Sequence, residues 1–200
     1  MKKFNVAVLI GLMFSIMLSS FSVFASDCEN IRHDVLRLHI LADSDSKEDQ
    51  TLKLQVRDKI LSLDAELFSQ ATNLTDAKNI AADQLQNIKE VAEAEIQARG
   101  YDYIVKVELK NMYFSTREYE TFTLPAGKYD ALRVTIGSGE GKNWWCVLYP
   151  PLCIPAASTQ LEFDDLLTTE QVEIVGNKQK YKFKFASVEI CEKLKNIIFD

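Results

Sequence analysis

The stretch "VLRLHILADSDSKEDQTLKLQVRDKIL", residues 35–61, decides the fold because its hydrophobic period changes in the middle. In the first seven residues, three aliphatic side chains point to one side, and Arg37 and His39 point to the other. Alternation of this kind predicts a strand with one buried face and one solvated face. The polar residues that follow end the strand and lead into a helix.

Ser46 is well placed to cap that helix at its N-terminus. Asp49, three residues later, resembles the second member of a capping box with a shorter acid. The apolar residues Leu52, Val56 and Ile60 then fall on one helical face. The acidic run "DSDSKED" also resembles the start of a calcium loop, but it lacks the glycine at the sixth position and has a lysine at a ligand position. We therefore interpret these residues as a cap and expect no metal here.

The rest of the chain continues with a second helix, then a run of strands. The second helix spans about 76–99, with Thr75 as its cap and Gly100 at its end. In the turn "LPAGKY", Gly127 is free to take a positive φ. The alternating pattern predicts strands at 103–109, 112–119, 129–136, 144–149 and 180–185, and a last helix at 188–198.

Consecutive strands with short links favour antiparallel pairing, and the loop "GSGEGKN" (137–143) is expected to join two of them as a hairpin. The predicted fold class is therefore α+β: a single domain with a mainly antiparallel sheet, covered on one face by amphipathic helices. That domain spans residues 26–200. The same loop fails as a phosphate-binding P-loop, because its glycines and its final residue do not match the motif.

The N-terminus has the pattern of a signal peptide. Lys2 and Lys3 precede an apolar run, and Val23 and Ala25 stand at the −3 and −1 positions of a cleavage site. This predicts that residues 1–25 are removed. The alternative is an uncleaved membrane anchor, since an apolar stretch of about 20 residues spans a bilayer.

Charge and cysteine content restrict the function classes. Removal of the two N-terminal lysines leaves 21 basic and 29 acidic residues, a formal charge of −8. This argues against a nucleic-acid surface, which needs clustered basic residues.

Four cysteines outside the cytosol favour disulfides. Cys146–Cys153 is the local pairing and Cys28–Cys191 would join the two ends, while buried free thiols are the alternative.

The stretch "GKNWWCVLYPPLC", residues 141–153, is the most unusual part of the chain. In a strand its two tryptophans point to opposite faces, so that one can reach the core. An exposed tryptophan beside two prolines would be a rigid anchor of the kind that interfaces favour. We therefore predict a partner-binding segment, with the alternative that both tryptophans are buried. Its candidate contact residues are Trp144, Trp145, Tyr149, Pro150 and Pro151.

No catalytic constellation stands out in the sequence. There is no nucleophile elbow and no zinc-protease motif, and the carboxylates are scattered. A thiol hydrolase using Cys146 or Cys153 with His39 is the alternative that residue types allow. A cell-envelope binding module is another. We predict no catalytic residues, no cofactor and no small-molecule substrate.

Two segments together resemble the stage II sporulation protein R family of endospore-forming bacteria. They are "RLHILADSDSKEDQTLKLQVRDKIL" (37–61) and "LPAGKYDALRVTIGSGEGKNWWCVLYPPLC" (124–153), within a family-like core at 31–153. The resemblance implies a secreted signal with no enzymatic activity, made in the forespore and exported into the space between the forespore and mother-cell membranes. It also implies a partner, the membrane-embedded aspartic protease of the mother cell that matures pro-sigma-E.

Overall fold

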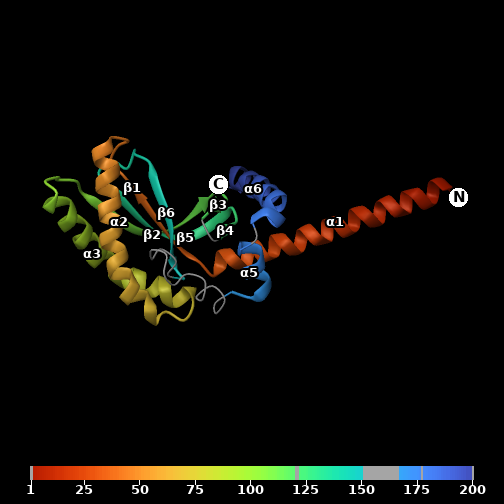
Figure 1. Cartoon of the computed structure of the whole chain (residues 1–200), viewed down its shortest axis with the longest axis horizontal. Coiled ribbons are helices and arrows are strands. Elements are labelled where there is room, and N and C mark those ends of the chain that lie inside the picture. Colours follow the sequence, from red (N-terminus) through yellow and green to blue (C-terminus); the bar gives the residue numbers. More distant parts are fainter. Residues whose placement is uncertain (1, 120–121, 151–166, 177, 200) are drawn as a thin grey trace. The chain divides into compact units, whose positions relative to one another are not determined.

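The computed structural model describes residues 2–119, 122–150, 167–176 and 178–199. Its contacts divide the chain into two compact units (Figure 1). The first, called here the sheet unit, comprises His33–Tyr113 and Lys128–Leu167. The second, called the helical unit, comprises Met1–Arg32, Phe114–Gly127 and Thr168–Asp200. The expectation of a single domain over 26–200 stays a prediction, because compact units of this size occur both within one domain and as separate domains.

The sheet has four strands in the order β2-β5-β1-β6. These are β1 (Leu36–Leu41), β2 (Val105–Phe114), β5 (Gly127–Ile136) and β6 (Asn143–Tyr149). β1 is parallel to β5 and antiparallel to β6. The sheet is therefore mixed, and the prediction of a mainly antiparallel sheet is wrong. The reason is that β1 lies between β5 and β6, so these two consecutive strands do not form the expected hairpin.

Two helices of the sheet unit cover one face of the sheet. They are α2 (Lys47–Leu67), followed by the short η1 (Phe68–Gln70), and α3 (Leu74–Ala98), which lie side by side in Figure 1. Alternate residues of β1 meet the apolar stripes of both helices. The core includes Leu36, Leu38 and Ile40 of β1, Leu52, Val56 and Ile60 of α2, and Ala77, Ala81, Ile88, Ala92 and Ile96 of α3. The stripe predicted for α2 is thus confirmed at Leu52, Val56 and Ile60, which are buried together. In α3 only Ile88 and Ile96 of the predicted stripe are buried; alanines make the rest of the buried face, and Ile80, Leu85 and Val91 are partly exposed.

The cap of α3 lies two residues earlier than predicted. Asn73 has an extended backbone, and its side-chain oxygen accepts a hydrogen bond from the backbone N–H of Asp76 at 2.9 Å. Asparagine is at least as good an N-cap as threonine. The helix therefore begins at Leu74, and Thr75 lies within its first turn.

The face of β1 that was predicted to meet solvent is buried. Arg37 is fully buried and His39 is 3% exposed. The guanidinium of Arg37 lies 5.0 Å from the ring centre of Tyr129, and the imidazole of His39 lies 4.6 Å from the ring centre of Trp145. Both faces of an internal strand can be covered, and aromatic rings offer a cationic side chain a favourable surface. The aliphatic side chains of β1 pack against the helices, and Arg37 and His39 pack against aromatic rings on the other face. The prediction that this second face meets solvent is therefore wrong.

The helical unit is built from α1 (Lys2–His33), α5 (Thr169–Gly176) and α6 (Lys178–Phe199), with a two-stranded pair of β3 (Arg117–Glu118) and β4 (Thr123–Leu124). The predicted last helix is present within α6, but the predicted strand at 180–185 is wrong because those residues are helical too. Tyr181 and Phe185, four residues apart, share one face and both contact Phe24. The lysine-aromatic alternation therefore suited a helix as well as a strand.

The strands predicted at 103–109 and 112–119 also differ from the structure. They form one long strand, β2, followed by the separate β3. Gly127 does take a positive φ, 146°, as the turn pattern predicts. A β-carbon at Gly127 would lie 2.4 Å from Cδ of Arg32, whose guanidinium donates to the carbonyl oxygen of Ala126 at 2.9 Å. Only glycine therefore lets this arginine reach the turn.

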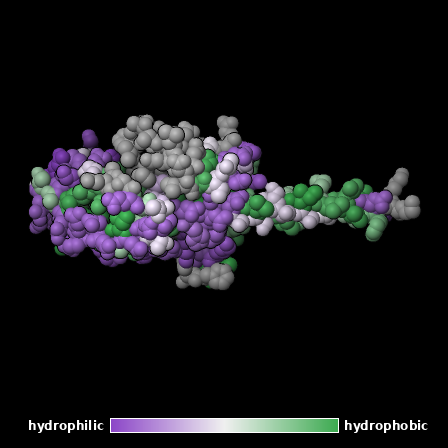
Figure 2. Space-filling view, turned by 90° about the horizontal axis from the view of Figure 1, so that it is seen from below, coloured by the Kyte–Doolittle hydropathy of each residue, from purple (hydrophilic) through white to green (hydrophobic). Residues whose placement is uncertain are grey.

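The apolar N-terminal helix is compatible with the predicted signal peptide. α1 is long and apolar enough to cross a membrane, and its side chains between Phe4 and Leu18 are exposed (Figure 2). A signal sequence near the N-terminus has the same properties. Around the predicted cleavage site the helix is packed instead: Phe24 is 3% exposed and its ring lies 5.5 Å from that of Tyr181.

Candidate functional site

The loop between β5 and β6 passes over the end of β1. Because β1 lies between β5 and β6 in the sheet, the loop that joins β5 to β6 must span about 10 Å, twice the distance between neighbouring strands. In crossing, it meets the residues that leave β1 for α2. We call the two segments 42–49 and 137–143 together the loop junction. It brings together the two sequence stretches that were singled out independently from their patterns.

Aspartates of the first segment hold the backbone of the second. Oδ1 of Asp43 accepts from the backbone N–H of Ser138 at 2.6 Å, and the Ser138 hydroxyl donates to the carbonyl oxygen of Asp43 at 2.8 Å. Oδ1 of Asp45 accepts from the backbone N–H of Lys142 at 2.7 Å. Carboxylates that accept from backbone N–H groups form stronger hydrogen bonds than neutral acceptors. The acidic run is thus a clamp for the facing loop.

Backbone hydrogen bonds and glycines bring the two segments into close contact. The N–H of Gly141 donates to the carbonyl oxygen of Ala42 at 3.0 Å. A β-carbon at Gly141 would lie 2.2 Å from the carbonyl oxygen of Ser44, and one at Gly137 would lie 2.1 Å from Oδ1 of Asp43. Gly137 also has a φ of 59°. The glycines of "GSGEGKN" are therefore there for close approach between loops.

A second network links the junction to the start of α2. The Ser46 hydroxyl accepts from the backbone N–H of Asp49 at 3.1 Å, which is the geometry of an N-cap. The backbone N–H of Ser46, which a capping box would pair with the Asp49 carboxylate, donates to Ser44 Oγ. The Asp49 carboxylate accepts from the hydroxyl groups of Ser44 and Tyr103. The hydrogen bond from Ser44 is the main cause that holds the pKa of Asp49 below its ordinary value.

Lys53 ties α2 to the far end of the crossing loop. Its ammonium donates to the carbonyl oxygen of Lys142 at 2.8 Å and to Oε1 of Gln50 at 2.6 Å, and the residue is 4% exposed. Burial lowers the pKa of Lys53, while the charge of Asp45 opposes that shift. The sequence did not identify Lys53, Tyr103 or Ser138 as site residues, because each acts across a long sequence separation. The signal available is the set of three glycines in the loop, at 137, 139 and 141.

The two tryptophans lie at the start of β6 and point to opposite faces, as predicted. Trp144 is opposite Ile40, on the side of the helices, and the guanidinium of Arg57 lies 4.3 Å from its ring centre. Trp145 is opposite His39, on the other side of the sheet. Both are partly buried. Each ring therefore has one side covered by a cation or an imidazole, with part of its surface still open to solvent.

The later members of the predicted contact set are buried or lie outside the described residues. Tyr149 is 3% exposed and Pro150 is buried. Neither side chain offers much surface to a partner in this structure. Pro151 lies outside the described residues. The role of these three residues in partner binding stays a prediction.

The cysteines fall into two groups. Cys28 and Cys191 are free thiols, so the predicted pairing between the two ends of the chain is not formed. Burial raises the pKa of Cys28 to about 12, which makes it an unreactive thiol. Cys146 is disulfide-bonded. Cys153 lies outside the described residues, so the pairing Cys146–Cys153 stays a prediction.

A thiol hydrolase that uses Cys146 would need this thiol beside His39, and the structure does not place the two together. Paired residues of antiparallel strands share a face, and Cys146 is opposite Leu38 while Trp145 is opposite His39. Cys146 packs against the core on one face, and His39 is buried on the other. Burial lowers the pKa of His39 to about 4, with Arg133 and Arg37 acting in the same direction and Asn143 opposing. The imidazole is therefore neutral at pH 7.

Beside the junction there is a shallow pocket on the sheet unit. Its volume is about 400 Å³, and Lys47 and Glu48 of the first turn of α2 line it with Arg99 and Tyr101. Within the described parts of the chain, no three His, Cys, Asp or Glu side chains are grouped so as to hold a metal ion. The carboxylates of Asp43 and Asp45 accept backbone hydrogen bonds, and the exposed side chains of the junction include Glu48, Glu140 and Lys142.

Comparison with known proteins shows which family this chain is similar to. The family described as stage II sporulation protein R matches residues 32–159. The chain belongs to this family. It is 37% identical over 123 residues to the stage II sporulation protein R of Bacillus subtilis (strain 168), which covers 62% of this chain and 55% of that relative. The chain thus spans little more than half the length of this relative. No solved structure matches the chain.

The matched residues contain the whole sheet unit except its last few residues. Both segments of the loop junction and all of β6 lie inside the match. α5 and α6 of the helical unit lie outside it.

Proposed function

We propose that this chain is a secreted signal of sporulation, made in the forespore, that triggers a mother-cell membrane aspartic protease to process pro-sigma-E. Membership of the stage II sporulation protein R family supports a sporulation role. The apolar N-terminal helix supports export. The place of action would be the space between the two membranes, where the protease exposes its extracytoplasmic surface.

The observation that carries the proposal is the loop junction. Two stretches nearly a hundred residues apart are clamped together by Asp43, Asp45 and Lys53 into one rigid surface. A signal acts by presenting such a preorganised surface, since ordering before binding lowers the cost of association. The exposed side chains of the junction include Glu48, Glu140 and Lys142. Trp144 and Trp145 continue this surface along β6.

Chemistry at the junction also favours a signal over an enzyme. The carboxylates of Asp43, Asp45 and Asp49 accept from backbone N–H groups and hydroxyls, which gives these three a structural role. The Cys146 side chain and the His39 side chain point to opposite faces of the sheet. The proposal therefore assigns no catalytic residue to this chain and leaves the cleavage chemistry to the protease.

Co-expression in a bacterium that does not sporulate tests the proposal. The host would produce the aspartic protease, pro-sigma-E and this chain, and the length of sigma-E would be followed by immunoblot. Processing that requires both the protease and this chain is the expected result. If pro-sigma-E is processed equally without this chain, or is never processed although all three proteins accumulate in the membrane and exported fractions, the proposal is wrong.

A further inference from the structure

The last helix of the chain, α6, carries an exposed apolar stripe. Phe183, Ile190, Leu194 and Ile197 follow one another at intervals of seven, four and three residues, which places them on one side of the helix. They are 88%, 61%, 53% and 78% exposed. The opposite side is occupied by the buried Phe185. Helices of soluble proteins seldom leave a contiguous apolar face in water, so this stripe marks a contact surface.

The charge of α6 is opposite to that of the protein. The helix holds six lysines and two glutamates, a formal charge of +4, in a chain whose formal charge is −6. Its glutamates point inward: Glu192 lies 3.7 Å from Arg32, and Glu189 accepts from the backbone N–H of Thr116 at 3.3 Å. Both are largely covered. Each also pairs with a lysine of the same helix, Glu189 with Lys193 at 2.8 Å and Glu192 with Lys195 at 2.9 Å, and these lysines stay 55% and 61% exposed. The outer surface of the helix is therefore apolar along its centre and basic along its sides.

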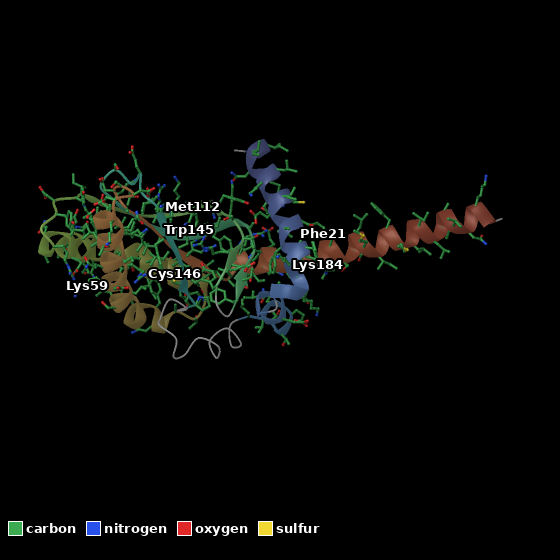
Figure 3. The ribbon with its side chains drawn as sticks, turned by 45° about the horizontal axis from the view of Figure 1, so that its top comes forward. Phe21, Lys59, Met112, Trp145, Cys146 and Lys184 are labelled. Atoms are coloured by element: carbon green, nitrogen blue, oxygen red, sulfur yellow. The ribbon has the colours of Figure 1, made fainter. Side chains whose placement is uncertain are left out.

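α6 also packs against the helix that carries the export signal. Its Lys184 donates to the hydroxyl of Ser20 at 3.2 Å, and Figure 3 shows Lys184 on α6 beside Phe21 of α1. The apolar part of α1 that can cross a membrane lies directly before Ser20. The apolar and basic surface of α6 is thus built onto the segment of the protein that is closest to a bilayer during export.

From these observations we propose that α6 is a membrane-surface helix, which lies in the interface of a bilayer rich in anionic phospholipid. An apolar stripe bordered by lysines on a helix of this length is the pattern of an interfacial helix, in which aromatic and aliphatic side chains enter the headgroup region and basic side chains meet anionic lipids. After removal of residues 1–25, α6 keeps the protein at the membrane. Binding to the bilayer raises the local concentration of this protein at the membrane surface, where it can meet a membrane-embedded partner.

The native cysteine of α6 supplies a probe for this proposal. Cys191 is an exposed free thiol, whereas Cys28 is buried with a raised pKa, so an environment-sensitive fluorophore such as NBD can be attached to Cys191 selectively. The exported protein, labelled in this way, would be titrated with phosphatidylglycerol–phosphatidylcholine vesicles and with pure phosphatidylcholine vesicles. The processed protein that begins at Ser26 is used, because α1 is apolar enough to insert into vesicles of either composition.

A blue-shifted, brighter emission with anionic vesicles, and at least tenfold weaker binding to pure phosphatidylcholine, is the expected result. The double variant Leu194→Asp/Ile197→Asp should lose the response. Lys182→Glu should weaken binding about fivefold or more, the size expected for a basic residue at an anionic surface. Ile104→Asp, which changes an equally exposed isoleucine in the sheet unit, is the matched control and should bind like the wild type.

Three outcomes would overturn the proposal. One is an emission that does not respond to vesicles. Another is equal binding to both kinds of vesicle. The third is a shift that depends on protein concentration without any vesicles, which would assign the stripe to a second copy of the chain. Circular dichroism of each variant establishes that loss of binding is not loss of folding.

Discussion

Gly141 is the residue on which the close approach of the two junction segments depends. A β-carbon there would lie 2.2 Å from the carbonyl oxygen of Ser44, a backbone atom that cannot rotate away. We expect Gly141→Ala to separate the segments, to destabilise the fold by about 1–3 kcal/mol, as overpacking does, and to reduce signalling strongly. Gly176→Ala, where the added carbon meets no atom within 4 Å, should leave both unchanged. Chemical denaturation and the processing assay measure the two effects; equal behaviour of both variants would refute this explanation.

Ser46 gives a second test among single residues. Its hydroxyl accepts from the backbone N–H of Asp49, so Ser46→Ala should lower the free energy of unfolding by about 1 kcal/mol, the usual effect of a lost N-cap. Calcium should not raise the melting temperature, because the carboxylates of Asp43 and Asp45 already accept backbone hydrogen bonds. A calcium-dependent rise would instead assign these acids to a metal site, since a ligand of the native state stabilises it.

The lowered pKa of the buried His39 should make the stability of the fold depend on pH. Its pKa is about 4 in the folded protein and about 6.5 in an unfolded chain, so the unfolded state binds more protons between these values. The stability that His39 contributes is complete above pH 6.5 and is lost as the pH falls from 6.5 to 4. The variant His39→Gln should lack this part of the slope in a series of denaturant melts. Parallel pH profiles for the two proteins would contradict the buried, neutral imidazole.

At the level of elements, β6 and its disulfide lead to a test by thiol counting. We expect two free thiols in the native exported protein, with Cys191 reacting quickly and Cys28 slowly. Cys146→Ser and Cys153→Ser should each lower stability by about 2 kcal/mol, as expected for a small closed loop, and should lose signalling together with stability. The outcome against this account is a fast-reacting thiol at either position whose serine variant folds normally and is inactive.

The elements were predictable from sequence where their information is local. The periods of β1, α2, α3, β5 and β6 appear in the order of apolar residues, and the Ser46 cap in its residue type. The position of β1 between β5 and β6 was not predictable in this way, because strand order depends on pairing between distant segments. The same holds for the burial of Arg37 and His39, whose aromatic neighbours come from Tyr129 and Trp145.

The candidate site shows the same limit. The sequence indicates a cap in one segment and a hairpin loop in the other, but it does not show that the two are in contact. The acidic run that contains Asp43 resembles a calcium loop, whereas in the structure the Asp43 carboxylate accepts from the N–H of Ser138. A single sequence shows which residues can accept hydrogen bonds and does not show which distant donors they meet.

For the whole molecule, we predict that the N-terminal segment is cleaved after Ala25. Mass spectrometry of the exported protein should find Ser26 at the N-terminus. Cleavage also removes Phe24, whose ring contacts Tyr181 and Phe185, so limited proteolysis should cut α6 faster in the processed protein than in the precursor. A functional form that retains Met1 would show that α1 is a permanent anchor.

The central claim, that the loop junction is the surface by which this chain acts, has one direct measurement. In the co-expression host, the fraction of pro-sigma-E that is processed would be compared for wild type, Glu48→Arg/Glu140→Arg and the control Asp83→Arg/Glu90→Arg. All four acids are exposed, and the control pair lies on α3, away from the junction segments in sequence. The account predicts that the junction variant is exported and folded but supports at most a tenth of wild-type processing, and that the control supports normal processing. Normal processing with the junction variant would contradict the claim.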